Sequence, residues 1–113
     1  MAQNKNKLIN LFIGNASNSV VHKILEKAIK KEELTNKYRK KLIASFEIAK
    51  RYRDKINPSH THLPEKDVLY IKDKLIKRVK AELSLRISKG YENINLEDVE
   101  KEVDEILRNL EVV

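Results

Sequence analysis

The segment YRDKINPSHTHLPEKD, residues 52–67, contains both prolines of the chain and two of its three histidines. A residue before proline is disfavoured in the helical region, so a helix that reaches this segment ends at Asn57, before Pro58. Pro64 suits the first turn of a following helix, because the amide hydrogen that proline lacks would have no partner at that position. The segment therefore predicts a bend between two long helices.

On both sides of this bend the apolar residues recur with the period of a helix, and no segment alternates with period two. The predicted helices cover residues 5–13, 17–31, 36–56, 64–89 and 96–110. Gly14-Asn15 separates the first two, and Gly90 caps the fourth at its C-terminal end. The expected fold is all-α, a compact bundle of four to five helices built on a long antiparallel helical hairpin of the third and fourth helices. With 113 residues, the chain is expected to form a single helical domain, residues 1–113.

The composition excludes several classes of protein. Hydrophobic residues make up 41% and charged residues 36%, which is too apolar for a disordered chain and too charged for a membrane-embedded one. No apolar run is long enough to span a bilayer, so we expect a cytoplasmic protein with no membrane partner. Without cysteine, the chain can form neither a disulfide nor a cysteine zinc site. Abundant Lys and Glu are typical of thermophilic proteins, archaeal ones included, and also of proteins from A+T-rich genomes.

The net charge of +7 is unevenly distributed along the chain. Residues 1–57 carry fourteen Lys or Arg against five Asp or Glu, and residues 58–90 carry eight against four. Residues 91–113 reverse the balance, with two basic residues against eight acidic ones. The sequence therefore predicts long basic helices and an acidic last helix.

Basic residues are dense on the two long predicted helices, and the predicted pI is about 9.6. Lysine and arginine on the faces of a helix suit contact with the phosphates of RNA or DNA. Aromatic residues make up only 5% and fall mostly on the predicted core side, so backbone contact without base recognition is expected. The candidate nucleic-acid-binding residues are Lys37, Lys40, Lys41, Lys50, Arg51, Lys55, Lys77, Arg78 and Lys80. The competing interpretation is that these residues only keep the protein soluble.

Residues 96–110 have the most regular apolar pattern of the chain, with apolar residues three and four positions apart. These residues are Leu96, Val99, Val103, Ile106 and Leu110. Such a seam packs inside the domain or pairs with a second copy of the chain. The alternative to nucleic-acid binding is therefore a homo-oligomerising adaptor or assembly subunit, which would bind a second copy or another protein through this acidic helix.

Three cations fall on the apolar sides of the long helices, where a charge needs a partner or a route to water. They are Arg53, Lys72 and Arg86. Packing of the acidic last helix against the basic ones would supply carboxylates such as Glu100 or Asp104. The sequence thus predicts an ion pair between the last helix and at least one of these cations.

Arg53, Asp54 and His60 resemble the Arg-polar-spacer-His signature of HEPN domains, a group of small all-α folds. Many members of this group are ribonucleases that act as dimers. The resemblance implies that Arg53 and His60 would form a catalytic pair, with Asp54 as the adjacent polar residue. It covers residues 53–60 alone, so a HEPN-like ribonuclease ranks below the two binding hypotheses.

The remaining residues favour a protein without catalytic activity or cofactor. Gly14 and Gly90 are isolated, which excludes a glycine-rich phosphate loop, and no serine is adjacent to a predicted base and acid. His60 and His62 have the local appearance of a metal site, but two imidazoles are too few for a closed one. No catalytic residue, cofactor or metal site is therefore predicted, and the balance lies against an enzyme.

Overall fold

The computed structural model describes residues 5–29, 31–56 and 63–112, and all regular structure in these ranges is helical. α1 spans Lys5–Ala28, α2 Glu32–Ile56, α3 Glu65–Ser88 and α4 Asp98–Asn109. The helices form a compact body of about 44 × 24 × 23 Å. The expectation of an all-α bundle is confirmed, with four helices in the described ranges. None of these four is long and apolar enough to cross a membrane.

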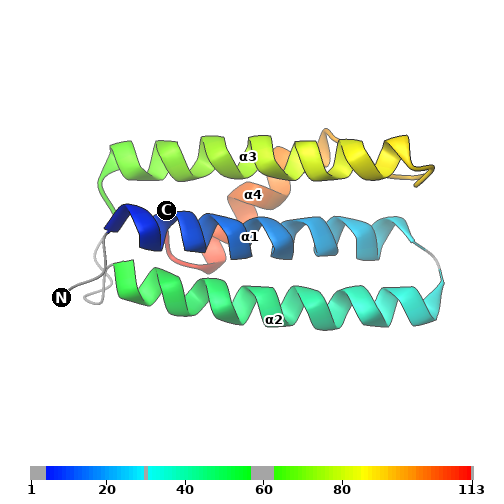
Figure 1. Ribbon diagram of the computed structural model, residues 1–113, viewed down its shortest axis with the longest axis horizontal. Coiled ribbons are helices and arrows are strands. Elements are labelled where there is room, and N and C mark those ends of the chain that lie inside the picture. The colour runs from blue at the N-terminus through cyan, green and yellow to red at the C-terminus, as the bar shows by residue number, and fades with distance from the viewer. Residues whose placement is uncertain (1–4, 30, 57–62, 113) are drawn as a thin grey trace.

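α1 lies at the centre of the bundle. α3, α1 and α2 form one layer in that order, and α4 lies on one face of this layer, behind α1 (Figure 1). α2 runs antiparallel to α1, and α3 runs parallel to it (Figure 1). Within the described ranges the backbone of α2 lies close to that of α1 and to that of neither other helix. The long antiparallel pair in contact is therefore α1 with α2, whereas a hairpin of residues 36–56 with 64–89 was expected.

α1 is one continuous helix of 24 residues, so the predicted interruption at Gly14-Asn15 is wrong. Phe12 and Ala16, on either side of that point, are fully buried. A glycine costs a helix about 1 kcal/mol relative to alanine, whereas burial of one large apolar side chain contributes about 1.5–3 kcal/mol. Tertiary packing therefore outweighs the local preferences of Gly14 and Asn15.

The core lies mainly between α1, α3 and α4. The apolar residues with no exposed surface include Phe12, Leu25, Ile71, Leu75, Val79, Leu83, Val99, Val103 and Leu107. On α2, in contrast, the buried residues are Tyr38, Ala49 and Arg53. α2 is thus a peripheral helix that covers one edge of α1 and leaves most of its own surface open.

α3 ends in a Schellman motif, in which the residue after the cap has a left-handed conformation. This residue is Gly90, with a φ of 101°. The amides of Gly90 and Tyr91 donate hydrogen bonds to the carbonyls of Ile87 and Arg86, at 3.0 and 3.1 Å. The predicted end of the helix at Gly90 is therefore confirmed.

α4 ends in the same motif, with Glu111 in the left-handed position at a φ of 57°. The amide of Val112 donates to the carbonyl of Leu107 at 2.8 Å, and both side chains are buried. Arg53 of α2 reaches this end, where its Nε and Nη2 donate to the carbonyl of Glu111 at 3.2 and 2.8 Å. Arg53 thus joins the end of α4 to α2.

The acidic α4 packs against the basic helices, as its charge predicts. Glu102 is buried, and its carboxylate lies 2.7 Å from Nζ of Lys27 and 2.9 Å from Nζ of Lys23. Burial raises the pKa of Glu102, but the hydrogen bonds and charges of the two lysines outweigh it and hold the pKa below its usual value. Lys72 pairs with Asp104 at 2.9 Å, which confirms the predicted ion pair.

Replacement of each glycine by alanine is expected to change stability in opposite directions. A Cβ on Gly14 would lie 3.8 Å from the Arg78 guanidinium, an ordinary contact. Gly14→Ala should therefore raise the free energy of unfolding by about 0.5–1 kcal/mol. Gly90→Ala should lower it by about 1–2 kcal/mol, because a left-handed φ is unfavourable for a side chain. Chemical denaturation measures both changes, and a loss of stability in Gly14→Ala would contradict the open packing at this position.

Candidate nucleic-acid interface

Six of the nine candidate binding residues lie on α2, and all six are exposed: Lys37, Lys40, Lys41, Lys50, Arg51 and Lys55. The backbone of α2 lies close to that of α1 alone among the helices, and the side of α2 that faces away from α1 is exposed. None of the six forms an ion pair with another described residue, in contrast to Arg39, which pairs with Glu26. α2 thus presents a set of cations that are available to phosphate groups.

The three candidates on α3 face different surroundings. Lys77 pairs with Asp73 at 3.1 Å on the exposed side of the helix. Lys80 faces α4, with its Nζ 3.9 Å from the carboxylate of Glu100. Arg78 lies against the backbone of α1. The nine candidates therefore do not form one continuous surface, because α1 lies between α2 and α3.

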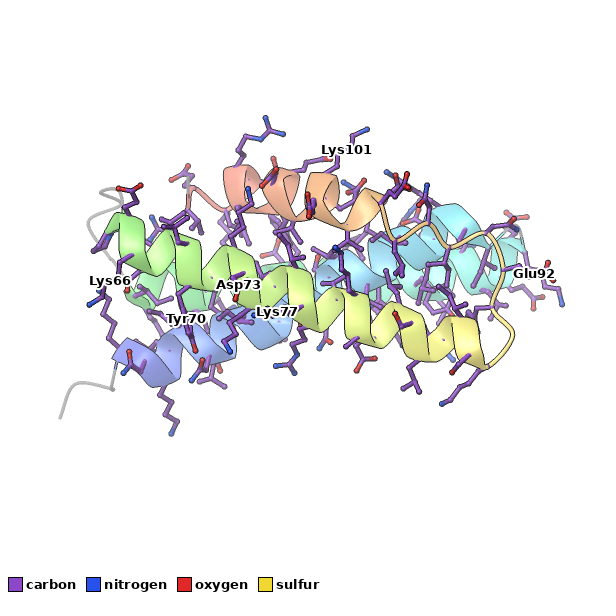
Figure 2. The ribbon with its side chains drawn as sticks, turned by 90° about the horizontal axis from the view of Figure 1, so that it is seen from above. Lys66, Tyr70, Asp73, Lys77, Glu92 and Lys101 are labelled. Atoms are coloured by element: carbon purple, nitrogen blue, oxygen red, sulfur yellow. The ribbon has the colours of Figure 1, made fainter. Side chains whose placement is uncertain are left out.

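A groove between α1 and α3 contains polar residues that were not predicted. It consists of three adjoining hollows of about 670, 410 and 440 Å³, and Asn10 lines all of them. Figure 2 shows Tyr70 and Lys77 on the side of α3 that borders α1, away from α4. Besides Asn10, the polar lining comprises Asn6, Lys7, Asn15 and Asn18 of α1 and Lys66, Asp67, Tyr70, Lys74, Lys77 and Arg78 of α3.

The signal for the α1 side of this groove is present in the sequence. Asn6, Asn10, Gly14 and Asn18 recur every four positions, and residues this far apart lie on the same face of a helix. No acidic residue precedes Glu26 in α1. These residues share one face only if α1 is one continuous helix, because a break at Gly14 would place Asn6 and Asn10 on a different helix from Asn18.

The groove is positively charged. Five cations line it, and one of them, Lys77, is paired with Asp73; the five are Lys7, Lys66, Lys74, Lys77 and Arg78. Asp67, the carboxylate in the lining, is neutralised by Lys5, whose Nζ lies 2.8 Å away. Clefts lined by one sign of charge concentrate ions of the opposite sign, so this groove attracts anionic ligands.

His22 lies one helical turn beyond Asn18 on the same side of α1. Its Nδ1 is 2.7 Å from the carbonyl of Asn18, and its ring packs against Tyr38 with 5.9 Å between centroids. Burial lowers the pKa of His22, the Asn18 carbonyl partly offsets this, and the charges of Lys41 and Arg86 lower the pKa further. With a pKa below its usual value, His22 is mostly neutral at pH 7 and adds little charge to the interface.

The ribonuclease hypothesis depends on Arg53 and His60, and the structure describes Arg53 but not His60. Arg53 is 1% exposed, with its guanidinium bonded to the end of α4, and this position gives it a structural role. His60 and His62 lie outside the described residues. Within the ranges that are described, no three His, Asp or Glu residues form a group that could hold a metal ion.

The apolar seam of α4 is used inside the bundle. Val99, Val103 and Leu107 have no exposed surface, and Leu110 is 3% exposed. Ile106 is 7% exposed and Leu96, just before α4, is half-buried, so the seam packs mostly within the bundle. The adaptor hypothesis stays a prediction.

The candidate interface thus combines an open basic helix with a basic, amide-lined groove, an arrangement suited to an extended anionic ligand. Comparison of the chain with protein-family models, curated proteins and solved structures finds no match. The basis for a function is therefore the chemistry of these two surfaces.

Proposed function

We propose that this protein binds the sugar-phosphate backbone of RNA or DNA through the exposed cations of α2 and of the groove between α1 and α3. The observation that carries this proposal is the set of six α2 cations that form no ion pair with another described residue. A cation that binds a phosphate releases counterions from the nucleic acid, and this release drives association. Exposed, unpaired cations are the residues best able to make such contacts.

The distribution of the carboxylates also supports this proposal. The carboxylates of α4 pair with Lys23, Lys27, Lys72 and Lys80. Those lysines hold α4 against the bundle, whereas the six candidate cations of α2 and most of the cations in the groove form no ion pair with another described residue. Positive potential is therefore concentrated on α2 and the groove, where it would attract a polyanion.

Reversal of two α2 charges is expected to weaken the binding of nucleic-acid strands. In the double variant Arg51→Glu, Lys55→Glu, two phosphate contacts would be lost. The affinity should then fall by at least about tenfold. The slope of the logarithm of the association constant against the logarithm of the salt concentration should become shallower by the amount that corresponds to about two phosphate contacts. Fluorescence anisotropy with a labelled oligonucleotide at several salt concentrations measures both quantities.

The matched control is Lys101→Glu, Arg108→Glu, which makes the same charge change at exposed positions of α4. Figure 2 shows Lys101 on the side of α4 that points away from the other helices. This control is expected to keep the affinity within about threefold of the wild type, because exposed charges far from the ligand are screened. Equal losses in both variants would contradict the assignment of the contacts to α2 and favour a purely solubilising role.

A further inference from the structure

Tyr70 is the exposed aromatic residue of the groove. Its side chain is 45% exposed, whereas the other aromatic residues in the described ranges are buried or half-buried. Tyr70 lines two adjoining hollows of about 410 and 440 Å³, sizes within the ~300–1,000 Å³ typical of small-ligand sites. An exposed ring between two hollows is a platform on which a planar group can stack.

The surroundings of this ring suit a charged planar ligand. Nζ of Lys74 lies 5.7 Å from the ring centroid, and Lys66 and Arg78 line the two hollows beside it. The Tyr70 hydroxyl lies 3.4 Å from Oδ1 of Asn10, so the ring points across the groove toward α1. A group stacked on Tyr70 would therefore have cations within reach on either side.

The asparagines distinguish this groove from a plain basic surface. Phosphate oxygens only accept hydrogen bonds, so a site for phosphate alone needs donors such as lysine and arginine. An asparagine side chain both donates and accepts, which matches the mixed edges of nucleobases. Asparagine is also a poor helix former, and Asn6, Asn10 and Asn18 are exposed on α1. Several such residues on one open face indicate a role in binding rather than in stability.

We propose that the groove binds a single-stranded segment of nucleic acid, with one unpaired base stacked on Tyr70. Asn10, the α1 asparagine that contacts Tyr70, binds the edge of that base, and Lys66, Lys74 and Arg78 bind the flanking phosphates. Neighbouring bases cover each base face in a duplex, so Tyr70 can stack only on an unpaired base. This inference rests on the backbone binding proposed above and adds a base contact to it, which the sequence-based expectation left out.

The test compares two strands with the same number of phosphates. One is an oligothymidylate, and the other is an abasic strand, which keeps the sugar-phosphate backbone without the bases. The wild-type protein is expected to bind the oligothymidylate at least about tenfold more tightly. The preference should persist in Tyr70→Phe, which keeps the ring, and disappear in Tyr70→Leu, which replaces the ring by an aliphatic side chain.

A single charge placed in the groove tests the location of the site. Asn10→Asp keeps the shape of the side chain and adds a negative charge, so the affinity for either strand should fall by about fivefold. Asn109→Asp makes the same change at the exposed last residue of α4 and should leave the affinity unchanged. Similar losses in both variants would contradict binding in the groove.

The outcomes separate this inference from the proposed function. Salt-dependent binding of both strands with equal affinity would overturn base stacking and leave backbone binding in place. A preference for the oligothymidylate that survives in Tyr70→Leu would overturn the role of Tyr70. A lack of binding to either strand at low salt would overturn both proposals.

Discussion

A chain that ends at Gly90 is expected to lose its cooperative unfolding transition, because α4 and the residues after it supply a large part of the core. The buried apolar residues of this segment are Val99, Val103, Ile106, Leu107, Leu110 and Val112. Burial of each contributes about 1.5–3 kcal/mol, so their sum is comparable to the ~5–15 kcal/mol that stabilises a typical small protein. Circular dichroism melting and binding of a hydrophobic dye measure the loss.

Polar contacts would be lost in the same truncation. Lys23 and Lys27 would lose the buried carboxylate of Glu102, and Arg53 would lose the carbonyl of Glu111 to which it donates. A buried charge without its partner is costly, and Arg53 is buried, so the loss of its acceptor adds to the loss of apolar burial. The truncated chain is therefore expected to behave as an expanded, partly helical state.

Two point variants control for the effect of the truncation. Leu107→Ala, in the core, is expected to lower the free energy of unfolding by about 2–5 kcal/mol. Leu85→Ala, at a position that is 51% exposed, should change it by less than about 0.5 kcal/mol. A truncated chain that melts like the full-length protein would contradict this account of the core. Such a result would mean that folding does not require α4, and it would favour the hypothesis that α4 binds a partner.

The second large effect is expected at Arg53. Arg53→Ala should lower the free energy of unfolding by about 2–4 kcal/mol, because it leaves a cavity and removes the donors to the Glu111 carbonyl. Arg53→Met should cost less, since it fills a similar volume and introduces no charge. Chemical denaturation of the purified variants gives these differences.

The adjacent Arg51 provides the control for Arg53, because it is exposed on the same helix. Arg51→Ala should change stability by less than about 0.5 kcal/mol. The ribonuclease hypothesis makes the opposite prediction for Arg53→Ala, namely loss of RNA cleavage with unchanged stability. Wild-type stability of Arg53→Ala would therefore contradict the structural role assigned to this residue.

The parts of the fold that follow from local chemistry could be predicted from the sequence. Pro64 and Gly90 mark the ends of α3: proline fixes its own φ and has no amide hydrogen, whereas glycine, which has no Cβ, can adopt the left-handed φ that ends the helix. The continuity of α1 could not be predicted in this way, because it depends on the burial of Phe12 and Ala16 by other helices. Which helix pairs with α2 is likewise decided by packing between distant segments, and residues 52–67 gave no information on it.

The candidate site shows the same division. The exposure of Lys37, Lys40, Arg51 and Lys55 follows from their place opposite the apolar residues of one helix, and Lys41 and Lys50, beside that side, are exposed as well. The groove could not be predicted, because it forms where Asn10 of α1 meets Tyr70 of α3, sixty positions away in sequence. The need of Arg53 for a partner, in contrast, was predicted correctly, because a charged residue on the apolar side of a helix requires one.

The most direct test of the proposed function is the salt dependence of binding between the wild-type protein and an oligothymidylate. The logarithm of the association constant should fall linearly with the logarithm of the salt concentration, with a slope of about −0.7 for each phosphate contact on a single strand. Four or more such contacts would give a slope of about −3 or steeper. No binding at low salt, or binding that does not change with salt, would contradict the proposal that the exposed cations bind phosphate.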